Sequence, residues 1–178
     1  MAADSSVSIS PDIGYRFAGY VDGEGHFAIT RNTKPRTGTV SYGVGFAMHV
    51  RADDRAVIER YRKELGDMGR FYEVAEQMRS TGYTSRPTVM WQVNRKRDCL
   101  TLVSLFETYT LWTKKAIDFH IWAKATRYMN GPKPEGWAPM ARWFDEIRAV
   151  RVYDSPEFAL DLAPPALLLF DDEELASA

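Results

Sequence analysis

Two carboxylates, Asp22 and Glu24, stand on either side of Gly23 in a glycine-rich segment near the N-terminus. Carboxylate oxygens are among the hard ligands that hold Mg²⁺ in proteins, so these acids could support metal-assisted chemistry. The same residues also fit a plain acidic turn at the end of an apolar helix. Which interpretation holds depends on the elements that position the two acids.

The residues around the acids predict a helix that is followed directly by a strand. Ala18 and Gly19 leave almost no side chain on a helix surface, which suits the close approach of a second helix. Gly25 can take the positive φ that a helix end often needs. From Phe27 onward the side chains alternate between two faces, as in a strand. A carboxylate therefore stands at the junction of the two elements.

Residues 17–27, FAGYVDGEGHF, resemble the LAGLIDADG motif of the homing endonuclease family, in the variant that reads roughly LAGFIDGEGSF. The correspondence is as follows: Phe17 takes the first Leu, Ala18 and Gly19 match, Tyr20 and Val21 take the two apolar positions, Asp22 matches, Gly23 takes the small position, Glu24 takes the second acid, and Gly25 matches. Residues 46–53, FAMHVRAD, resemble the end of the family's second strand and the cap of its second helix. Residues 111–119, LWTKKAIDF, resemble its Leu-x-Thr-x-Lys-x-x-Asp-Phe signature. The resemblance extends over residues 13–130.

The resemblance implies a metal-dependent phosphodiesterase site. It makes Glu24 the catalytic metal ligand, helped by the backbone of Gly23, and Mg²⁺ the metal. It also places Lys115 near the scissile phosphate, where a cation would stabilise transition-state charge or orient the attacking water. Lys114 is adjacent and could be confused with Lys115. Asp22 is interpreted as structural, binding backbone amides near the helix end.

A single motif further implies a homodimer, because two motif helices must pack together to bring two Glu24 carboxylates to two scissile phosphates. The expected helix contacts at this seam are Phe17, Ala18, Tyr20 and Val21. The expected partner is double-stranded DNA with a pseudo-palindromic site, and the expected product is a staggered double-strand break. At the end of the second strand, several members of the family carry Gln where this chain has Val50. Catalytic competence is therefore open, unless His49 or Arg51 substitutes.

The periodicity predicts an α+β domain with the element order αββαββα, followed by one more helix. Helices are expected near residues 13–22, 54–65, 98–109 and 113–129, and strands near 26–31, 40–51, 70–76 and 88–95. The four strands can pair as two hairpins, giving a four-stranded antiparallel sheet with helices on one face. The other face would be free to contact DNA. Its expected DNA-binding residues are His26, Thr30, Asn32, Lys34, Arg36, Ser41, His49, Arg51, Arg70, Tyr72, Gln92 and Asn94.

Composition gives weaker support for a DNA partner. The net charge is −1, but residues 151–178 hold seven acids and one base, which leaves 22 bases and 17 acids in residues 1–150. A modestly basic body thus precedes an acidic tail. One cysteine, Cys99, excludes an internal disulfide framework and a thiolate zinc cluster, and fits a small buried side chain. No apolar run is long enough to cross a bilayer, and no signal-peptide pattern is present, so we expect a soluble, intracellular protein without a membrane partner.

We divide the chain into a disordered segment (1–11), the endonuclease domain (12–130), a linker with a C-terminal helix (131–153) and a proline-broken acidic tail (154–178). The tail could be a plain solvated segment or could screen the DNA-binding face. Two rival functions share the fold. One is a catalytically weak or inactive sequence-specific DNA-binding protein, and the other is an RNA-splicing maturase.

Overall fold

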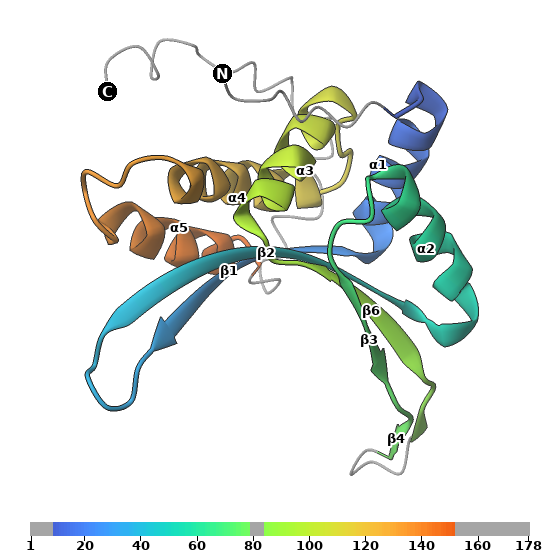
Figure 1. Cartoon of the computed structure of the whole chain (residues 1–178), viewed down its shortest axis with the longest axis horizontal. Coiled ribbons are helices and arrows are strands. Elements are labelled where there is room, and N and C mark those ends of the chain that lie inside the picture. Colours follow the sequence, from blue (N-terminus) through green and yellow to red (C-terminus); the bar gives the residue numbers. More distant parts are fainter. Residues whose placement is uncertain (1–8, 79–83, 152–178) are drawn as a thin grey trace, which may run out of the picture.

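The computed structural model describes residues 9–78 and 84–151 and shows an α+β arrangement (Figure 1). The elements in chain order are α1 (Pro11–Glu24), β1 (Gly25–Thr33), β2 (Val40–Arg51), a 3₁₀ turn (Ala52–Asp54), α2 (Arg55–Glu64), β3 (Arg70–Val74), β4 (Gln77–Met78), β5 (Thr84–Ser85), β6 (Thr88–Val93), α3 (Lys96–Thr108), α4 (Lys115–Asn130) and α5 (Ala138–Ala149). The predicted αββαββα order and the additional helix are confirmed. In the described part of the chain, no helix is both long and apolar enough to cross a membrane.

Four strands form one antiparallel sheet in the order β1-β2-β6-β3. The chain thus forms two hairpins that meet through β2 and β6, as the sequence predicts. The helices lie on one side of this sheet, and both hairpin ends reach away from them, which leaves the other side arched and uncovered (Figure 1). One difference is the two-residue ribbon of β4 and β5, where the sequence indicates only a polar loop.

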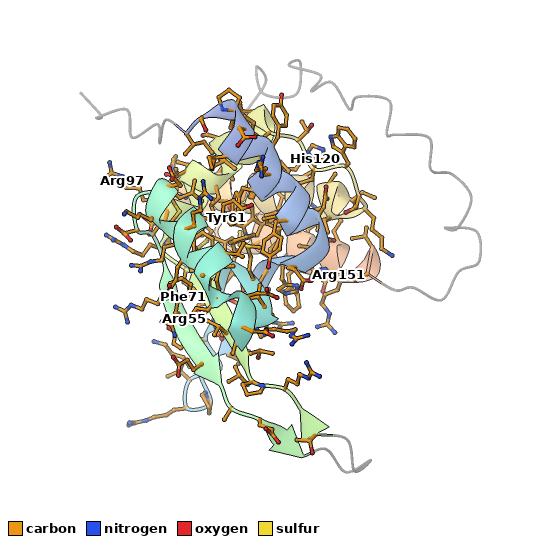
Figure 2. All side chains as sticks on the ribbon, turned by 90° about the vertical axis from the view of Figure 1, so that its right-hand side faces the viewer. Arg55, Tyr61, Phe71, Arg97, His120 and Arg151 are labelled. Carbon is orange, nitrogen blue, oxygen red and sulfur yellow. The ribbon has the colours of Figure 1, made fainter. Side chains whose placement is uncertain are left out.

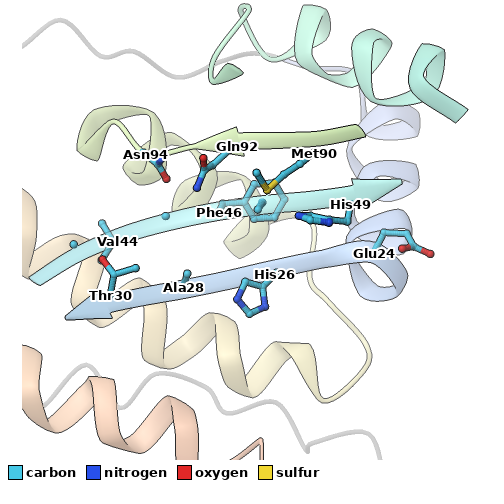
Figure 3. Close-up of a pocket in the computed structure, with 13 residues that line it drawn as sticks. Glu24, His26, Ala28, Thr30, Val44, Phe46, His49, Met90, Gln92 and Asn94 are labelled. Carbon is cyan, nitrogen blue, oxygen red and sulfur yellow. The ribbon is translucent and has the colours of Figure 1, made fainter. Parts of the chain in front are cut away.

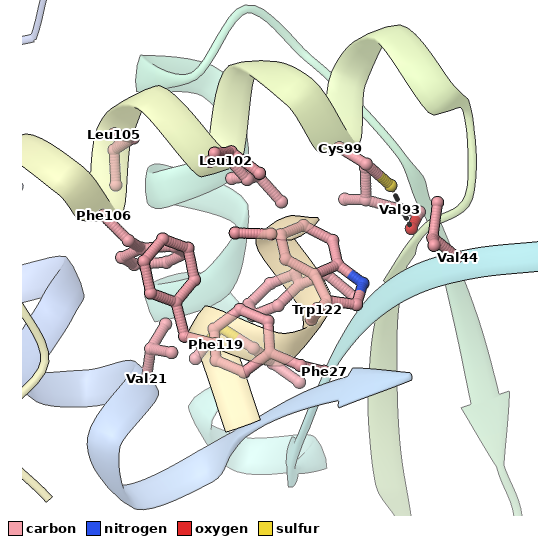
Figure 4. Close-up of a cluster of buried hydrophobic side chains, with 14 of the residues drawn as sticks. Val21, Phe27, Val44, Val93, Cys99, Leu102, Leu105, Phe106, Phe119 and Trp122 are labelled. Carbon is pink, nitrogen blue, oxygen red and sulfur yellow. Dashed lines mark hydrogen bonds between the residues drawn. The ribbon is translucent and has the colours of Figure 1, made fainter. Parts of the chain in front are cut away.

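Aromatic rings fill the space between the sheet and the helices (Figure 4). The ring of Phe27 on β1 lies 5.1 Å from that of Trp122 and 5.6 Å from that of Phe119, both on α4. Cys99 on α3 is fully buried, and its Sγ lies 3.5 Å from the Val93 carbonyl oxygen, to which the thiol donates. Burial raises the pKa of this thiol to about 12, so Cys99 is an inert core residue, as predicted.

Charged side chains extend this packing at the α2 edge (Figure 2). The guanidinium of Arg55 lies 5.6 Å from the ring centroid of Phe71 on β3 and pairs with Glu59 and Glu73. Nearly two turns further along α2, the ring of Tyr61 lies 4.9 Å from that of Phe17. Helix α2 therefore covers the β3 side of the sheet and also contacts α1.

The two ends of α1 differ in detail from expectation. Its first residue is Pro11, preceded by Ser10, whose hydroxyl accepts a hydrogen bond from the Ile13 amide. At the other end, Gly25 has φ −76° rather than a positive φ. Glycine is required there by space, because a Cβ on Gly25 would lie 2.5 Å from Cγ1 of Val21.

The inner face of α1 requires a second correction. Phe17, Ala18 and Val21 were expected at a seam between two chains, but they are at most 2% exposed within a single chain. The Phe17 ring is surrounded by the rings of Phe46, Tyr61, Trp91 and Phe106. These residues therefore bind α1 to its own core. The outward face of the helix carries Tyr15, Gly19 and Gly23, spaced four residues apart.

Helix α5 packs beside α4 and β1. The ring of Tyr42 on β2 contacts the rings of Phe144 on α5 and of Trp137 just before it. Just after it, Arg151 donates to the Asp118 carboxylate at 2.8 Å and to the Phe27 carbonyl oxygen at 2.5 Å. The predicted C-terminal helix is confirmed. Residues 1–8 and 152–178, with most of the expected disordered segment (1–11) and the acidic tail, lie outside the described residues, whereas Ser10 and Pro11 of that segment cap and begin α1.

The burial of Phe17 predicts that Phe17→Ala destabilises the single chain by about 3–5 kcal/mol, because a large ring is removed from a filled core. The free energy of unfolding from urea titration checks this value. Val57→Ala on the exposed side of α2 is the matched control and should change it by less than about 0.5 kcal/mol. If Phe17→Ala left the free energy of unfolding unchanged, the burial of this ring within a single chain would be wrong, and a contact between two chains would be the better interpretation.

Candidate functional site

The Glu24 carboxylate stands at the last residue of α1, where the chain turns into β1. It is exposed and borders a cavity of about 570 Å³ on the uncovered side of the sheet. Figure 3 shows Glu24 at one end of this cavity, near His49 and His26. No hydrogen bond joins the Glu24 carboxylate to another residue in the described ranges, so both oxygens remain available to a ligand.

Asp22 has the structural role that the sequence predicts. Its Oδ2 accepts a hydrogen bond from the Trp112 amide at 2.8 Å, and its Oδ1 accepts from the Thr113 amide at 3.2 Å and the Thr113 hydroxyl at 2.8 Å. These contacts join the end of α1 to the segment that leads into α4. The two acids of the motif are therefore divided between a satisfied structural carboxylate and an unoccupied one.

Lys115, the first residue of α4, reaches the turn that carries Glu24. Its Nζ donates to the carbonyl oxygen of Gly23 at 3.0 Å and to that of Gly25 at 2.5 Å. Burial lowers the pKa of Lys115, opposed by the attraction of Glu24 and neighbouring acids. Lys114 is exposed, so the structure distinguishes the two lysines and places Lys115 beside Glu24.

The uncovered side of the sheet forms a surface that we call the outer face. The register brings its side chains into cross-strand rows: His26–Ala47–Gln92–Arg70, Ala28–Gly45, Thr30–Gly43, Asn32–Ser41, His49–Met90–Tyr72 and Arg51–Thr88. Asn94 follows β6 and lies beside Gly45. All the strand residues predicted to bind DNA thus share one face, with Lys34 and Arg36 in the turn between β1 and β2. Arg51 is engaged by Asp53, with Nε–Oδ1 at 3.0 Å.

Val50 does not belong to this face. It is 5% exposed and points into the core, whereas the preceding His49 and the following Arg51 point outward. The alternation of a strand explains this, because neighbouring side chains lie on opposite faces. Val50 therefore supplies no polar group to the outer side of the sheet, and His49 is the outward residue nearest to Glu24 along β2 (Figure 3).

Two residues that the sequence did not assign to the site lie beside His26. Asp118 on α4 and Arg151 after α5 form an ion pair at 2.8 Å, in the same recess as His26 and Lys115. Burial and the positive charge of Arg151 lower the pKa of His26, although Asp118 opposes this shift. Both effects favour the neutral imidazole of His26. Asp118 belongs to the 111–119 signature and could have been found there, whereas no local pattern marks Arg151.

The donor set of one chain is small. Within the described residues, no group of three or more His, Cys, Asp or Glu side chains could hold a metal ion together. Glu24 with the neighbouring Gly23 carbonyl provides oxygen donors, the type that Mg²⁺ prefers. A single chain therefore offers a partial metal site that phosphate oxygens or a second carboxylate would have to complete.

Comparison with known proteins agrees with this geometry. The chain resembles the homing endonuclease I-GzeII in complex with its DNA target (22% identity, TM-score 0.59, covering 81% of this chain and 44% of that one). It also resembles I-SmaMI bound to an uncleaved DNA target with calcium ions (16%, 0.64, 80% and 46%) and the archaeal intron-encoded I-Vdi141I complexed with DNA (19%, 0.62, 78% and 83%). The chain spans less than half the length of the first two proteins. No curated protein matches it.

These likenesses, each below 25% identity, establish the fold. The family profile described as LAGLIDADG endonuclease matches residues 17–126, which begin at the first residue of the motif and end within α4. Because that match includes more than half of the chain, the protein belongs to the LAGLIDADG endonuclease family.

Proposed function

We propose that the protein is a homodimeric, Mg²⁺-dependent, site-specific DNA endonuclease that makes a staggered double-strand break in a pseudo-palindromic site. The observation that carries the proposal is the position of Glu24. An unpaired carboxylate stands at the edge of a polar, uncovered sheet face, with a lysine ammonium in contact with its own turn. This arrangement suits cleavage of a phosphodiester in a nucleic acid bound along the sheet.

The outer face has the properties of a surface that reads base edges. Its arched shape is free of helices, and its polar residues are mostly uncharged amides, hydroxyls and imidazoles (Figure 1). Such groups donate to and accept from base edges in the major groove. Lys34 and Arg36 at the β1–β2 turn, together with Arg70, supply charge for phosphates. Several structures of similar fold are described as bound to DNA, which supports the same partner here.

The metal would be held by the Glu24 carboxylate and the Gly23 carbonyl. When bound, Mg²⁺ would supply a Lewis acid for phosphoryl oxygens and favour deprotonation of the attacking water. The Gly23 carbonyl already accepts a hydrogen bond from Lys115, but a carbonyl oxygen has a second lone pair for a further contact.

Lys115 supplies the positive charge that the chain itself brings to the reaction. An ammonium has three N–H donors, and two are used by the Gly23 and Gly25 carbonyls. The third remains for a phosphate oxygen or the leaving oxygen, whose negative charge grows during hydrolysis. Because the two carbonyls hold the ammonium in place, little reorganisation is needed when that charge develops.

Two copies of the chain are needed for a double-strand break, because each provides one Glu24. The outward face of α1 suits such a dimer. Gly19 and Gly23 are exposed, and a Cβ on either would have no neighbouring atom within 4 Å. Trp112, 82% exposed, is fixed to the same end of α1 because its backbone N–H donates a hydrogen bond to the Asp22 carboxylate. These residues replace Phe17, Ala18 and Val21 as the proposed seam, and Tyr20 remains half-buried at its margin.

Glu24→Gln should abolish cleavage without weakening DNA binding, because the amide keeps the shape of the side chain but is a poor ligand for Mg²⁺. The measurement is a cleavage selection from a randomised duplex library with Mg²⁺, read by sequencing the product ends, with band-shift titration for binding. Products from Glu24→Gln would contradict the assignment. A wild-type chain that binds duplexes without cutting them would identify a DNA-binding protein, and preference for structured RNA would identify a maturase.

Lys115→Met should lower the single-turnover cleavage rate by about 10²–10³ while changing DNA affinity little, since its charge acts mainly in the transition state. Lys124→Met, on an exposed position of the same helix, is the matched control and should cleave at the wild-type rate. Equal effects of Lys115→Met on affinity and rate would instead make Lys115 a simple phosphate-binding residue.

Gly19→Leu should weaken dimerisation by roughly tenfold or more, because overpacking a close helix contact costs about 1–3 kcal/mol. The single chain should stay folded, since space surrounds this position within it. Sedimentation velocity with and without the selected duplex measures the effect. Lys63→Leu, exposed on α2, is the control for an added apolar side chain. A wild-type monomer on DNA would exclude the dimer.

A further inference from the structure

Two glycines, Gly43 and Gly45, occupy outer-face positions in the middle of β2, where glycine weakens a strand. Neighbouring side chains occupy the space above each of them. A Cβ on Gly43 would lie 2.8 Å from Oγ1 of Thr30, and a Cβ on Gly45 would lie 2.6 Å from Oδ1 of Asn94. Both distances are too short for real contacts. The absence of side chains on β2 is therefore what permits Thr30 and Asn94 to lie across it.

The position of the Asn94 side chain depends on the room above Gly45 and not on hydrogen bonds. It follows the last residue of β6, is exposed, and makes no hydrogen bond to another residue in the described part of the chain. It points over β2 into the cavity that Ala28 and Ala47 also line (Figure 3). Its amide N–H and carbonyl groups are thus free to pair with a ligand on the outer face.

This combination of groups matches one base pair better than the others. An asparagine amide can donate to N7 and accept from the N6 amino group of adenine in the major groove. The Ala28 and Ala47 methyl groups lie in the same cavity and can contact the C5 methyl of thymine. The absence of bulk at Gly43 and Gly45 lets the bases come close to the β2 backbone.

We propose that Gly45 is a specificity-determining positioning residue, which leaves room for Asn94 to read the adenine of an A·T pair in each half-site. This inference rests on the proposed DNA binding by the outer face. A methyl group at position 45 would displace only the end of a flexible side chain. The chain should therefore fold normally with Ala at this position but lose the directed contact.

The test is a binding selection with the full-length chain carrying Glu24→Gln, so that bound duplexes stay intact. Randomised duplexes should reveal one symmetric pair of positions at which A·T is preferred by about 5- to 150-fold, the range of a good amide–adenine pair. Asn94→Ala and Gly45→Ala should each reduce the preference at those same positions to the part that the contact of the alanine methyls with thymine supplies. The double variant should lose no more than either single variant, because both changes remove one contact.

Two controls separate this effect from a general loss of structure. Gly131→Ala lies away from the sheet, where a Cβ makes ordinary contact, and should leave the preference unchanged. The unfolding midpoint of Gly45→Ala should be no lower than that of the parent. Replacing the selected adenine by 7-deazaadenine should weaken the parent chain but not Asn94→Ala. Replacing the selected thymine by uracil should weaken both, since the alanine methyls remain.

The outcomes distinguish this inference from the broader function. If the parent binds duplexes selectively but Asn94→Ala leaves every preference unchanged, the inference is wrong and the proposed function stands. If Gly45→Ala changes other positions than Asn94→Ala does, the positioning role is wrong. If the parent binds no duplex at all, both fail together.

Discussion

The Asp22 carboxylate makes the interaction on which the site depends. It binds amides of Trp112 and Thr113, about 90 residues away along the chain. This contact joins the C-terminal end of α1 to the beginning of α4, and these two ends carry Glu24 and Lys115. Without it, the two ends would be joined only by helix packing and by the hydrogen bonds of the Lys115 ammonium to the Gly23 and Gly25 carbonyls. An acid that takes no part in the chemistry therefore fixes the two groups that we propose do.

Helix α1 has three roles, and each belongs to a different part of it: the inner face packs in the core, the outer face can meet a second helix, and the last residue presents Glu24. Its inner face, with Phe17 and Val21, is buried among the aromatic rings of the core. Its outer face, with Gly19 and Gly23, has no side chains that would keep a second helix away. Its last residue presents Glu24 at the edge of the sheet. Since a helix has 3.6 residues per turn, the eight consecutive residues 17–24 are sufficient for all three roles.

Sequence patterns predicted the elements well, because alternation and helical spacing record burial directly. Alternation also assigned the outer-face residues to one face, whereas the family resemblance, not periodicity, connected Lys115 with the turn that carries Glu24. Sequence patterns failed where the answer depends on three-dimensional packing. The sequence could not show that Phe17 turns inward, that Gly25 is needed for space beside Val21, or that Arg151 reaches Asp118. Alternation did place Val50 correctly on the buried face of β2, together with Tyr42 and Met48.

The modest positive charge of residues 1–150 and the small residues of β2 both bear on how the proposed DNA partner would bind. A surface with few unpaired cations gains little from phosphate attraction, and Arg51 is already engaged by Asp53. Affinity must then come more from close contact with the bases, which requires a sheet that the DNA can approach. Gly43, Gly45 and the neighbouring alanines lower the centre of the outer face, while Thr30 and Asn94 lie across it as the groups that can read. Because base contacts discriminate between sequences and phosphate contacts do not, such a surface favours selectivity over general attraction to DNA.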